Sequence, residues 1–324
     1  MKKLLSSILV VMIGITLVGC SSKGDTGVKI GLIQYAQHPA LDQANDSFIK
    51  ALEDNGYKKD KDFSIDIQNA QGEQATAETI ADKLVNDNND LIYAIGTPAA
   101  SSVAQKTQEI PTIVAAVTNP EDSQLVKSNK KPGGNITGVS DLTPVAKQID
   151  LLMKIAPKTK NVAVMYTNAE RNSEYQFSLA KKALEAKGVN VVKATVTDSN
   201  QVQQVAESIV KKVDAIYVPT DNLVSEGVAN VVNVANENKV PTVVGEIAMV
   251  EKGALITDGI NYSELGYLAG LQAVKILKGE AKPADMPIEY IADNKLELAI
   301  NDKTMKELGI KIPKDIMEKA KIVK

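Results

Sequence analysis

Short apolar runs alternate with amphipathic stretches along most of the chain after residue 27. In the first half, the apolar runs predict strands at 29–35, 63–69, 91–95 and 112–117. Stretches with apolar residues three or four positions apart predict helices at 39–55, 74–86 and 98–106. The run 91–95 is apolar throughout, which is typical of a strand buried on both faces of a parallel sheet. Alternation of this kind favours parallel strands joined by right-handed crossovers.

The second half repeats this pattern. Residues 161–167 match the first strand, and three further segments return in the same order, at offsets between 124 and 132 residues. They are Ala-Leu-Glu-x-x-Gly at 51–56 and 183–188, Asp-x-Ile-Tyr at 90–93 and 214–217, and x-Pro-Thr-x-Val at 110–114 and 240–244. Any two α/β units share a general pattern, but the identical residues favour an internal duplication. The predicted fold class is therefore α/β, with two doubly wound parallel-sheet lobes, an interlobe cleft and a hinge.

Turn-rich segments mark the connections between the two halves. Residues 132–141 lie between them and form the first candidate crossover. A second turn-rich stretch, 282–287, comes late in the chain. The remaining predicted elements are a helix at 223–238, a strand at 254–257, a helix at 263–278, a strand at 288–291 and short helices with exposed lysines after residue 302.

Composition narrows the function. With 324 residues, 44% of them hydrophobic and 24% charged, the chain has room for two domains. A net charge of −3 provides no basic field, so we expect no nucleic-acid partner. A single His excludes a multi-His metal site, a single Cys excludes an intrachain disulfide, and we expect no metal and no cofactor.

Enzyme signatures are missing. The sequence contains neither Gly-x-x-x-x-Gly-Lys-Ser/Thr nor Gly-x-Ser-x-Gly, and neither Gly-x-Gly-x-x-Gly nor His-Glu-x-x-His. Paired carboxylates for glycoside hydrolysis remain open, although nothing singles out a pair. We therefore expect a binding protein rather than an enzyme.

The N-terminus predicts export. Lys2 and Lys3 precede an apolar segment that ends in Leu-Val-Gly-Cys at Cys20. The segment is too short for an ordinary membrane span and resembles a bacterial lipoprotein signal, with Cys20 as the lipidated first mature residue. The interpretation is a signal peptide at 1–19 and a lipid-anchored tether at 20–27; the alternative is a plain signal peptide with an incidental Cys. The protein would then lie outside the cell, anchored to the outer face of a bacterial cytoplasmic membrane.

Candidate ligand residues lie in the loops that follow the predicted strands. In open parallel sheets, ligands bind at the carboxyl ends of the strands, and two such lobes would face one cleft. The candidates are Gln34, Tyr35, His38, Leu41, Thr97, Pro98, Ala99, Thr118, Asn119, Ser173, Asp221, Asn222, Glu246 and Asp258.

Each polar candidate has a structural alternative. Thr97 and the following helix N-terminus suit a ligand carboxylate, but Thr97 could equally be a helix N-cap. Asp221 could accept a ligand ammonium or cap the next helix. His38, held extended before a Pro, suits a hydrogen-bonding or shape role better than catalysis. Glu246 and Asp258 could meet a cation or serve the fold.

Several segments resemble those of ABC-transporter substrate-binding proteins with the type I periplasmic-binding-protein fold. They are Gln34 with His-Pro-Ala-Leu-Asp at 38–42, Ile-Gly-Thr-Pro-Ala-Ala at 95–100, Ala-Ala-Val-Thr-Asn-Pro at 115–120, Pro-Gly-Gly-Asn-Ile-Thr-Gly-Val-Ser-Asp at 132–141, Asn-Ala-Glu-Arg-Asn-Ser at 168–173 and Val-Pro-Thr-Asp-Asn at 218–222. The resemblance covers essentially the whole mature chain. It implies three crossovers, near 141, 261 and 286, and hence a first lobe of 28–141 plus 262–285 and a second of 142–261 plus 286–324.

The resemblance also implies a function. Similar members are associated with uptake of aromatic amino acids, tryptophan among them. The expected protein is a monomer that captures an amino acid by hinge closure and delivers it to an ABC permease with a cytoplasmic ATPase. Thr97 and nearby amides would hold the carboxylate, Asp221 the ammonium, and Tyr35, Leu41 and Pro98 the apolar part. The alternatives are a lipoprotein that reports to a signalling receptor and an exported α/β hydrolase.

Overall fold

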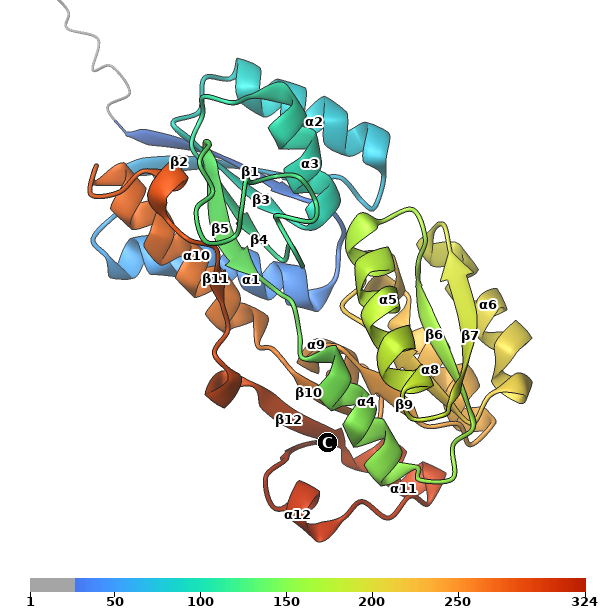
Figure 1. Ribbon diagram of the computed structural model, residues 1–324. Coiled ribbons are helices and arrows are strands. Elements are labelled where there is room, and N and C mark those ends of the chain that lie inside the picture. Colours follow the sequence, from blue (N-terminus) through green and yellow to red (C-terminus); the bar gives the residue numbers. More distant parts are fainter. Residues whose placement is uncertain (1–26) are drawn as a thin grey trace, which may run out of the picture.

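The computed structural model describes residues 27–324, which form two α/β lobes (Figure 1). The predicted signal peptide and Cys20 lie outside the described residues. No helix within residues 27–324 is long and apolar enough to cross a membrane.

The first lobe is a six-stranded sheet between two pairs of helices. Its strands are β1 (Val28–Gln34), β2 (Phe63–Asn69), β3 (Leu91–Ile95), β4 (Thr112–Ala115), β5 (Ile136–Ser140) and β11 (Glu289–Tyr290), in the order β11-β5-β4-β3-β1-β2. The helices are α1 (Pro39–Asp54), α2 (Gln74–Asn86), α3 (Thr97–Lys106) and α10 (Tyr262–Leu277). Helices α1 and α10 pack together on one face of the sheet, and α2 and α3 on the other (Figure 1).

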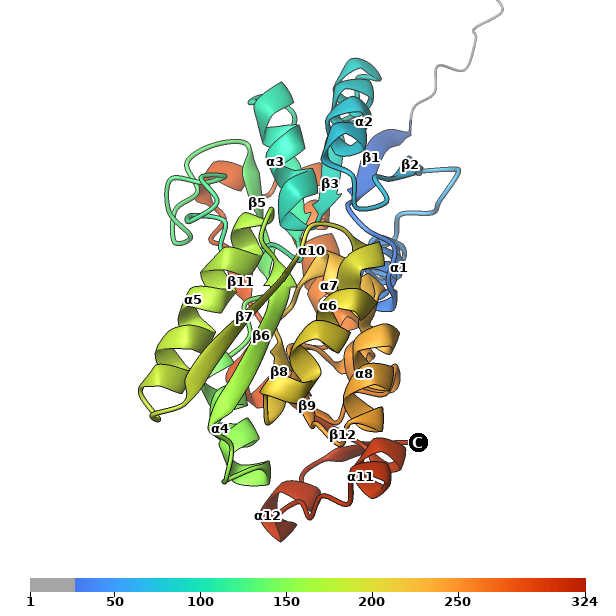
Figure 2. The ribbon, with the colours of Figure 1, turned by 90° about the vertical axis from the view of Figure 1, so that its right-hand side faces the viewer.

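The second lobe is a seven-stranded sheet with more helices around it. Its strands are β6 (Asn161–Thr167), β7 (Asn190–Val196), β8 (Ala215–Val218), β9 (Thr242–Val244), β10 (Ile256–Gly259), β12 (Glu297–Asn301) and β13 (Lys321–Val323), in the order β13-β12-β10-β9-β8-β6-β7. Its helices are α4 (Val145–Ile155), α5 (Arg171–Glu185), α6 (Val202–Ile209), α7 (Asn222–Glu226), α8 (Val228–Glu237), α9 (Ile247–Glu251), α11 (Asp302–Leu308) and α12 (Lys314–Met317). Helices α11 and α12 lie at the end of this lobe that is farthest from the first (Figure 2).

The predicted duplication is visible in the strand order. The succession β2-β1-β3-β4-β5 in the first sheet corresponds to β7-β6-β8-β9-β10 in the second, and all pairs in both runs are parallel. The repeated segments 90–93 and 214–217 each start one residue before a strand, β3 and β8 respectively, and continue into it. Two doubly wound lobes are therefore confirmed. The second sheet adds one antiparallel strand, β12, next to β10.

Three predicted segments differ from the structure. The segment 132–141 is not only a crossover, because β5 occupies 136–140 inside the first sheet. The predicted helix 223–238 is two helices, interrupted at Gly227. The boundary near 286 is misplaced, because β11 pairs with β5 and the chain leaves the first lobe only after residue 290.

Helix α10 returns to the first lobe and packs very closely on α1. Gly266 and Gly270 make this possible: a Cβ at Gly266 would lie 2.1 Å from the carbonyl oxygen of Ala44, and one at Gly270 would lie 2.7 Å from that of Phe48. Leu265 and Ala269 are fully buried in the first-lobe core. Chain segments more than 200 residues apart thus share one core.

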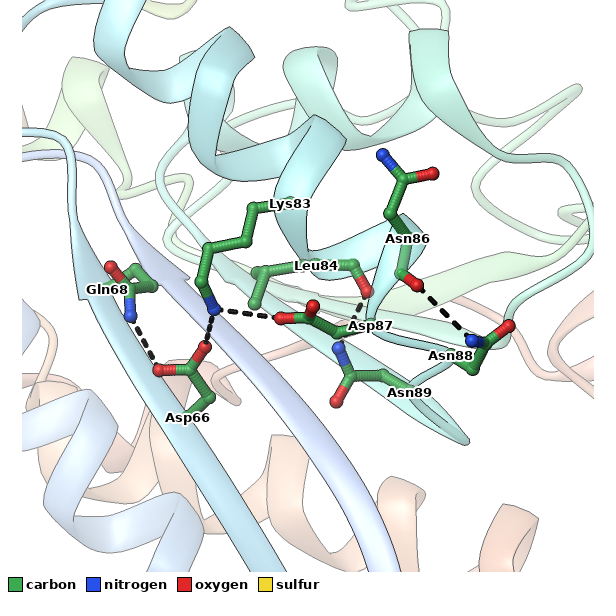
Figure 3. Close-up of polar contacts among 8 residues, drawn as sticks. All are labelled: Asp66, Gln68, Lys83, Leu84, Asn86, Asp87, Asn88 and Asn89. Carbon is green, nitrogen blue, oxygen red and sulfur yellow. Dashed lines mark hydrogen bonds and ion pairs between the residues drawn. The ribbon is translucent and has the colours of Figure 1, made fainter.

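Surface ion pairs fasten helices to the sheet within a lobe. Lys83 of α2 pairs with Asp66 on β2 and, at 2.8 Å, with Asp87 one turn later (Figure 3). In the same view the Asn89 side-chain amide donates to the Leu84 carbonyl, 2.6 Å away, at the end of α2. These side chains are partly exposed, so each pair stabilises the lobe only slightly.

Candidate functional site

The strand-end loops of the two lobes meet where Gly96 faces Asn222. Gly96 follows β3 with φ of 97°, a conformation that favours Gly. A Cβ there would lie 3.0 Å from Tyr35 Cβ and 3.6 Å from Asn222 Oδ1, an atom of the other lobe. Both the backbone and the available space therefore favour Gly at this interlobe contact.

Thr97 does not cap α3. Gly96 occupies the N-cap position and Thr97 is the first helical residue, so the predicted N-cap is one position too late. The Thr97 hydroxyl is buried, and within the described part of the chain it has no hydrogen-bond partner. The first turn of a helix also leaves backbone N–H groups without intrahelical partners. The Thr97 hydroxyl and the free N–H groups at the start of α3 can therefore hold an anionic group.

His38 is buried at the start of α1, beside Asn222. Neither ring nitrogen has a hydrogen-bond partner among residues 27–324. Burial lowers the pKa of His38 to about 4, against a weaker opposing effect of Asn222, so the ring is neutral at pH 7. A neutral imidazole offers one donor and one acceptor.

Asp221 is engaged within its own lobe. Its Oδ1 accepts hydrogen bonds from the Thr167 hydroxyl (2.8 Å) and the Val224 backbone N–H (2.9 Å). Its Oδ2 accepts from the Thr167 N–H (2.7 Å) and the Ser173 hydroxyl (2.6 Å). Asp221 is thus the N-cap of α7 and joins three segments of the second lobe, which is the structural alternative weighed from the sequence.

Glu170, unlike Asp221, has a carboxylate oxygen that, among the described residues, is free to contact a ligand. It precedes α5 and is only 3% exposed. Its Oε2 accepts from the side-chain amides of Asn172 and Asn222, whereas its Oε1 is buried without a partner in the described chain. Burial, and then the nearby Asp221 carboxylate, raise the pKa of Glu170 to about 8. The segment 168–173 that carries part of the family resemblance contains Glu170, but Glu170 is not among the candidate residues identified from the sequence.

Tyr35, His38, Thr97, Glu170 and Asn222 form what we call the interlobe cluster. Three come from the first lobe and two from the second. Tyr35 is buried, and its hydroxyl donates to the Gly72 carbonyl (2.7 Å). Burial, and then the nearby Glu170 carboxyl, raise the pKa of Tyr35. The cluster therefore combines an anion-accepting corner, a partly unpaired carboxylate and a neutral imidazole.

Other candidates have structural partners. The Gln34 amide donates to Asp42 and to the Ala36 carbonyl, and Asn119 accepts from the Asp122 N–H and from Asn129. Thr118 donates to Asp141 at 3.0 Å, and Ser173 donates to Asp221. Leu41 and Ala99 are buried in the first-lobe core, while Pro98 is partly exposed in the first turn of α3.

The two remaining carboxylates lie elsewhere. Glu246 caps α9 by accepting from the Ala248 N–H (3.2 Å), and it lines a cavity of about 190 Å³ with Tyr262 of the second crossover. Burial raises the pKa of Glu246 to about 8. Asp258 is half-buried in a different hollow, which Lys147 also lines. The structure does not bring Asp258 together with the interlobe cluster.

Known proteins resemble this chain over most of its length. A tyrosine-binding protein of Clostridioides difficile (strain R20291) is 40% identical over 323 residues, which cover 95% of this chain and 93% of that protein. A solved structure from Streptococcus pneumonia in complex with L-Trp is 38% identical, with a TM-score of 0.87 over 92% of this chain and 100% of that one. A substrate binding protein with adhesive properties from Clostridium difficile, in its ligand-free, open structure, is 43% identical, with a TM-score of 0.69 over 92% of this chain and 99% of that one.

A family model for ABC transporter substrate binding proteins matches residues 29–324. The family and these relatives are binding proteins, so the expectation that the chain is not an enzyme is confirmed. The type I periplasmic-binding-protein fold expected from the resemblance is confirmed as well. The chain belongs to the ABC transporter substrate binding protein family.

Proposed function

We propose that this protein captures an aromatic amino acid between its lobes and delivers it to an ABC permease with a cytoplasmic ATPase. Substrate-binding proteins of ABC transporters work outside the cytoplasm. The observation that carries the proposal is the set of buried, unpaired polar atoms on Thr97, His38 and Glu170, which come from both lobes. Buried polar atoms are normally hydrogen-bonded, so this set has the chemistry of a binding site for a polar ligand.

The two ends of an amino acid match the two sides of the cluster. The ligand carboxylate would accept hydrogen bonds from the Thr97 hydroxyl and from backbone N–H groups in the first turn of α3. The ammonium would pair with Glu170 Oε1, in place of the Asp221 contact expected from the sequence. Tyr35 and Pro98 would contact the apolar part. The ligand would therefore hold the lobes together through its own charges.

The arrangement of the lobes supports capture by closure. The chain superposes better on the L-Trp complex than on the open, ligand-free structure, although the latter is slightly more similar in sequence. Domain closure around a ligand is a known mode of conformational change. We therefore assign the present arrangement to the closed form.

The ligand class can be tested by thermal shift and calorimetry. The panel is tryptophan, tyrosine, phenylalanine, leucine and glutamate, with purified protein carrying Cys20→Ser. An aromatic amino acid at a hundred times its Kd should add about 2.7 kcal/mol to the free energy of unfolding. We expect tryptophan or tyrosine to raise the melting temperature most. A panel in which none of the aromatic members shifts it would refute the assignment.

Two variants test the pose. Thr97→Val and Glu170→Gln should each weaken the Kd by roughly thirtyfold or more, because a charged group in a desolvated site loses its partner at a cost of about 2–5 kcal/mol. Thr79→Val and Glu53→Gln, on exposed faces of α2 and α1, are the matched controls and should leave the Kd unchanged. Equal affinities for the Thr97 variant and its control would contradict the carboxylate contact.

We also propose that Cys20 carries a lipid that anchors a monomeric protein to the membrane. The support is the sequence of residues 2–20. Cys20→Ser should move the protein from the membrane fraction to the medium of a Gram-positive host. Retention of the variant on the membrane would argue for a different anchor.

A further inference from the structure

The first turns of α5 contact the loop after β4, across the boundary between the lobes. Arg171 Nε donates to Asp122 Oδ2, 3.1 Å away. Arg171 is the single arginine of the chain and begins α5 in the second lobe, while Asp122 lies in the first lobe. Figure 2 shows the upper end of α5 beside the loop that joins β4 to β5. The pair therefore joins the two lobes across their boundary in this arrangement.

A buried contact lies one and a half turns further along the same helix. Gln176 Nε2 donates to the Thr118 hydroxyl oxygen at 3.3 Å and to the Thr220 carbonyl at 2.7 Å. Thr118 in turn donates to Asp141, which also accepts from the Tyr262 hydroxyl at 2.7 Å. This chain of bonds connects α5 with the first and second crossovers, and all of its side chains are buried.

We propose that these contacts form a clasp that holds the closed form and sets how long a ligand stays bound. The clasp consists of Arg171 and Gln176 on one side and of Thr118 and Asp122 on the other. Glu170, the proposed ammonium contact, immediately precedes Arg171, so docking of α5 places that carboxylate in the site. The effect on residence time rests on the proposed function; the effect on closure does not.

The exposure of the Arg171–Asp122 pair sets the expected size of its effect on ligand dissociation. The Arg171 and Asp122 side chains are 53% and 35% exposed, and exposed ion pairs typically change an equilibrium by about two- to fivefold. Removing the pair should raise the ligand dissociation rate by that factor and leave the association rate nearly unchanged. The effect should shrink as salt rises from 0.05 to about 0.5 M, because exposed charges are screened.

A charge swap with a matched control tests the clasp. The variants are Asp122→Asn, Asp122→Arg, Arg171→Asp and the double swap, all in the full chain with Cys20→Ser. Asp66→Asn is the control, because Asp66 pairs with Lys83 at similar exposure but entirely within the first lobe (Figure 3). Since Cys20 is the only cysteine, spin labels at Glu78→Cys on α2 and Glu207→Cys on α6 can report the interlobe distance.

We expect each single reversal to populate the longer distance and to speed dissociation of tryptophan or tyrosine in stopped flow. The double swap should restore both, and Asp66→Asn should change neither. Single reversals that leave distance and dissociation as in the parent protein would overturn the clasp. If no amino acid binds, the function proposal fails, and the distances of the free protein still decide: a closed population that the single reversals reduce and the double swap restores supports the clasp, and any other result overturns it.

Discussion

At the residue scale, Glu170 makes the ligand-free protein sensitive to pH. Its pKa is about 8 in the folded state, against a usual value of 4.5, because burial and Asp221 disfavour the ionised form. An acid whose folded pKa is raised costs no stability below about pH 4.5 and a growing amount as pH rises towards 8. The Glu170 carboxyl ionises in the unfolded protein but stays protonated in the folded one across this window, so rising pH should destabilise the free protein.

Glu170→Gln isolates that effect. At about pH 4 the variant and the parent should melt at nearly the same temperature, since the Glu170 carboxyl is then mostly protonated in both the folded and the unfolded protein. At pH 8.5 the ligand-free variant should melt several degrees higher, because a shift of one pKa unit corresponds to about 1.4 kcal/mol. Thermal melts at both pH values measure this. A difference that is the same at about pH 4 and at pH 8.5 would show that the carboxyl does not titrate in this window.

Asp221→Ala should act in the opposite direction. The substitution leaves the Thr167 hydroxyl and N–H, the Ser173 hydroxyl and the Val224 N–H without their acceptor. Loss of an N-cap and of several buried acceptors should cost about 2–4 kcal/mol of unfolding free energy. Denaturant unfolding of the ligand-free protein at pH 7 provides the measurement. Parent-like stability, combined with a weakened Kd, would return Asp221 to the direct role that the sequence suggested.

At the scale of elements, the sequence predicted the buried parts of the fold well. The bounds of β2, α2 and β3 are as expected, because their apolar positions follow the period of the element. The strand β5 was missed because it lies in a Gly- and Pro-rich segment. A Cβ at Gly138 would lie 1.9 Å from the Val114 carbonyl oxygen, so Gly is required inside this strand by its neighbour.

The edge strands and the buried unpaired atoms could be identified only from the tertiary structure. β7 was not singled out, since it is an edge strand with only two buried residues. β12 was not predicted: it is only five residues long, and its partner β10 lies about 40 residues away in the sequence. Likewise, the sequence offered Thr97 as one of several polar loop residues. Only the structure shows that the Thr97 hydroxyl and Glu170 Oε1 are buried without a hydrogen-bond partner in the described chain.

The α1–α10 contact gives a sharp test of packing. Gly266→Ala adds a helix-favouring residue, which by itself would stabilise α10 by about 1 kcal/mol. The new Cβ, however, would lie 2.1 Å from backbone at Ala44, so the helices must separate. We expect a net loss of about 2 kcal/mol or more in denaturant unfolding, as for other overpacked cores. Lys275→Ala, exposed on the same helix, should stay within about 0.5 kcal/mol of the parent.

At the scale of the whole molecule, duplication explains why the ligand groups are divided between two bodies. Each lobe places the loop after its third parallel strand, β3 or β8, at the same edge: Gly96 and Thr97 in one, Asp221 and Asn222 in the other. The duplicated positions have diverged in chemistry. The first lobe provides the Thr97 hydroxyl, which is unpaired among the described residues, at the start of α3. The second provides the Asp221 carboxylate, which caps α7, and Asn222, which donates to Glu170.

This division predicts that one ligand protects both lobes at once. If an amino acid bridges Thr97 and Glu170, hydrogen exchange should slow in the segments 96–100 and 167–173 together, because opening either contact requires the lobes to separate. The exposed helix α2 and the distant α12 should exchange as before, since closure changes none of their hydrogen bonds. Mass spectrometry with and without saturating tryptophan or tyrosine tests this. Slowing confined to one lobe would mean that the ligand binds that lobe alone without closure, which contradicts the proposed mechanism of capture.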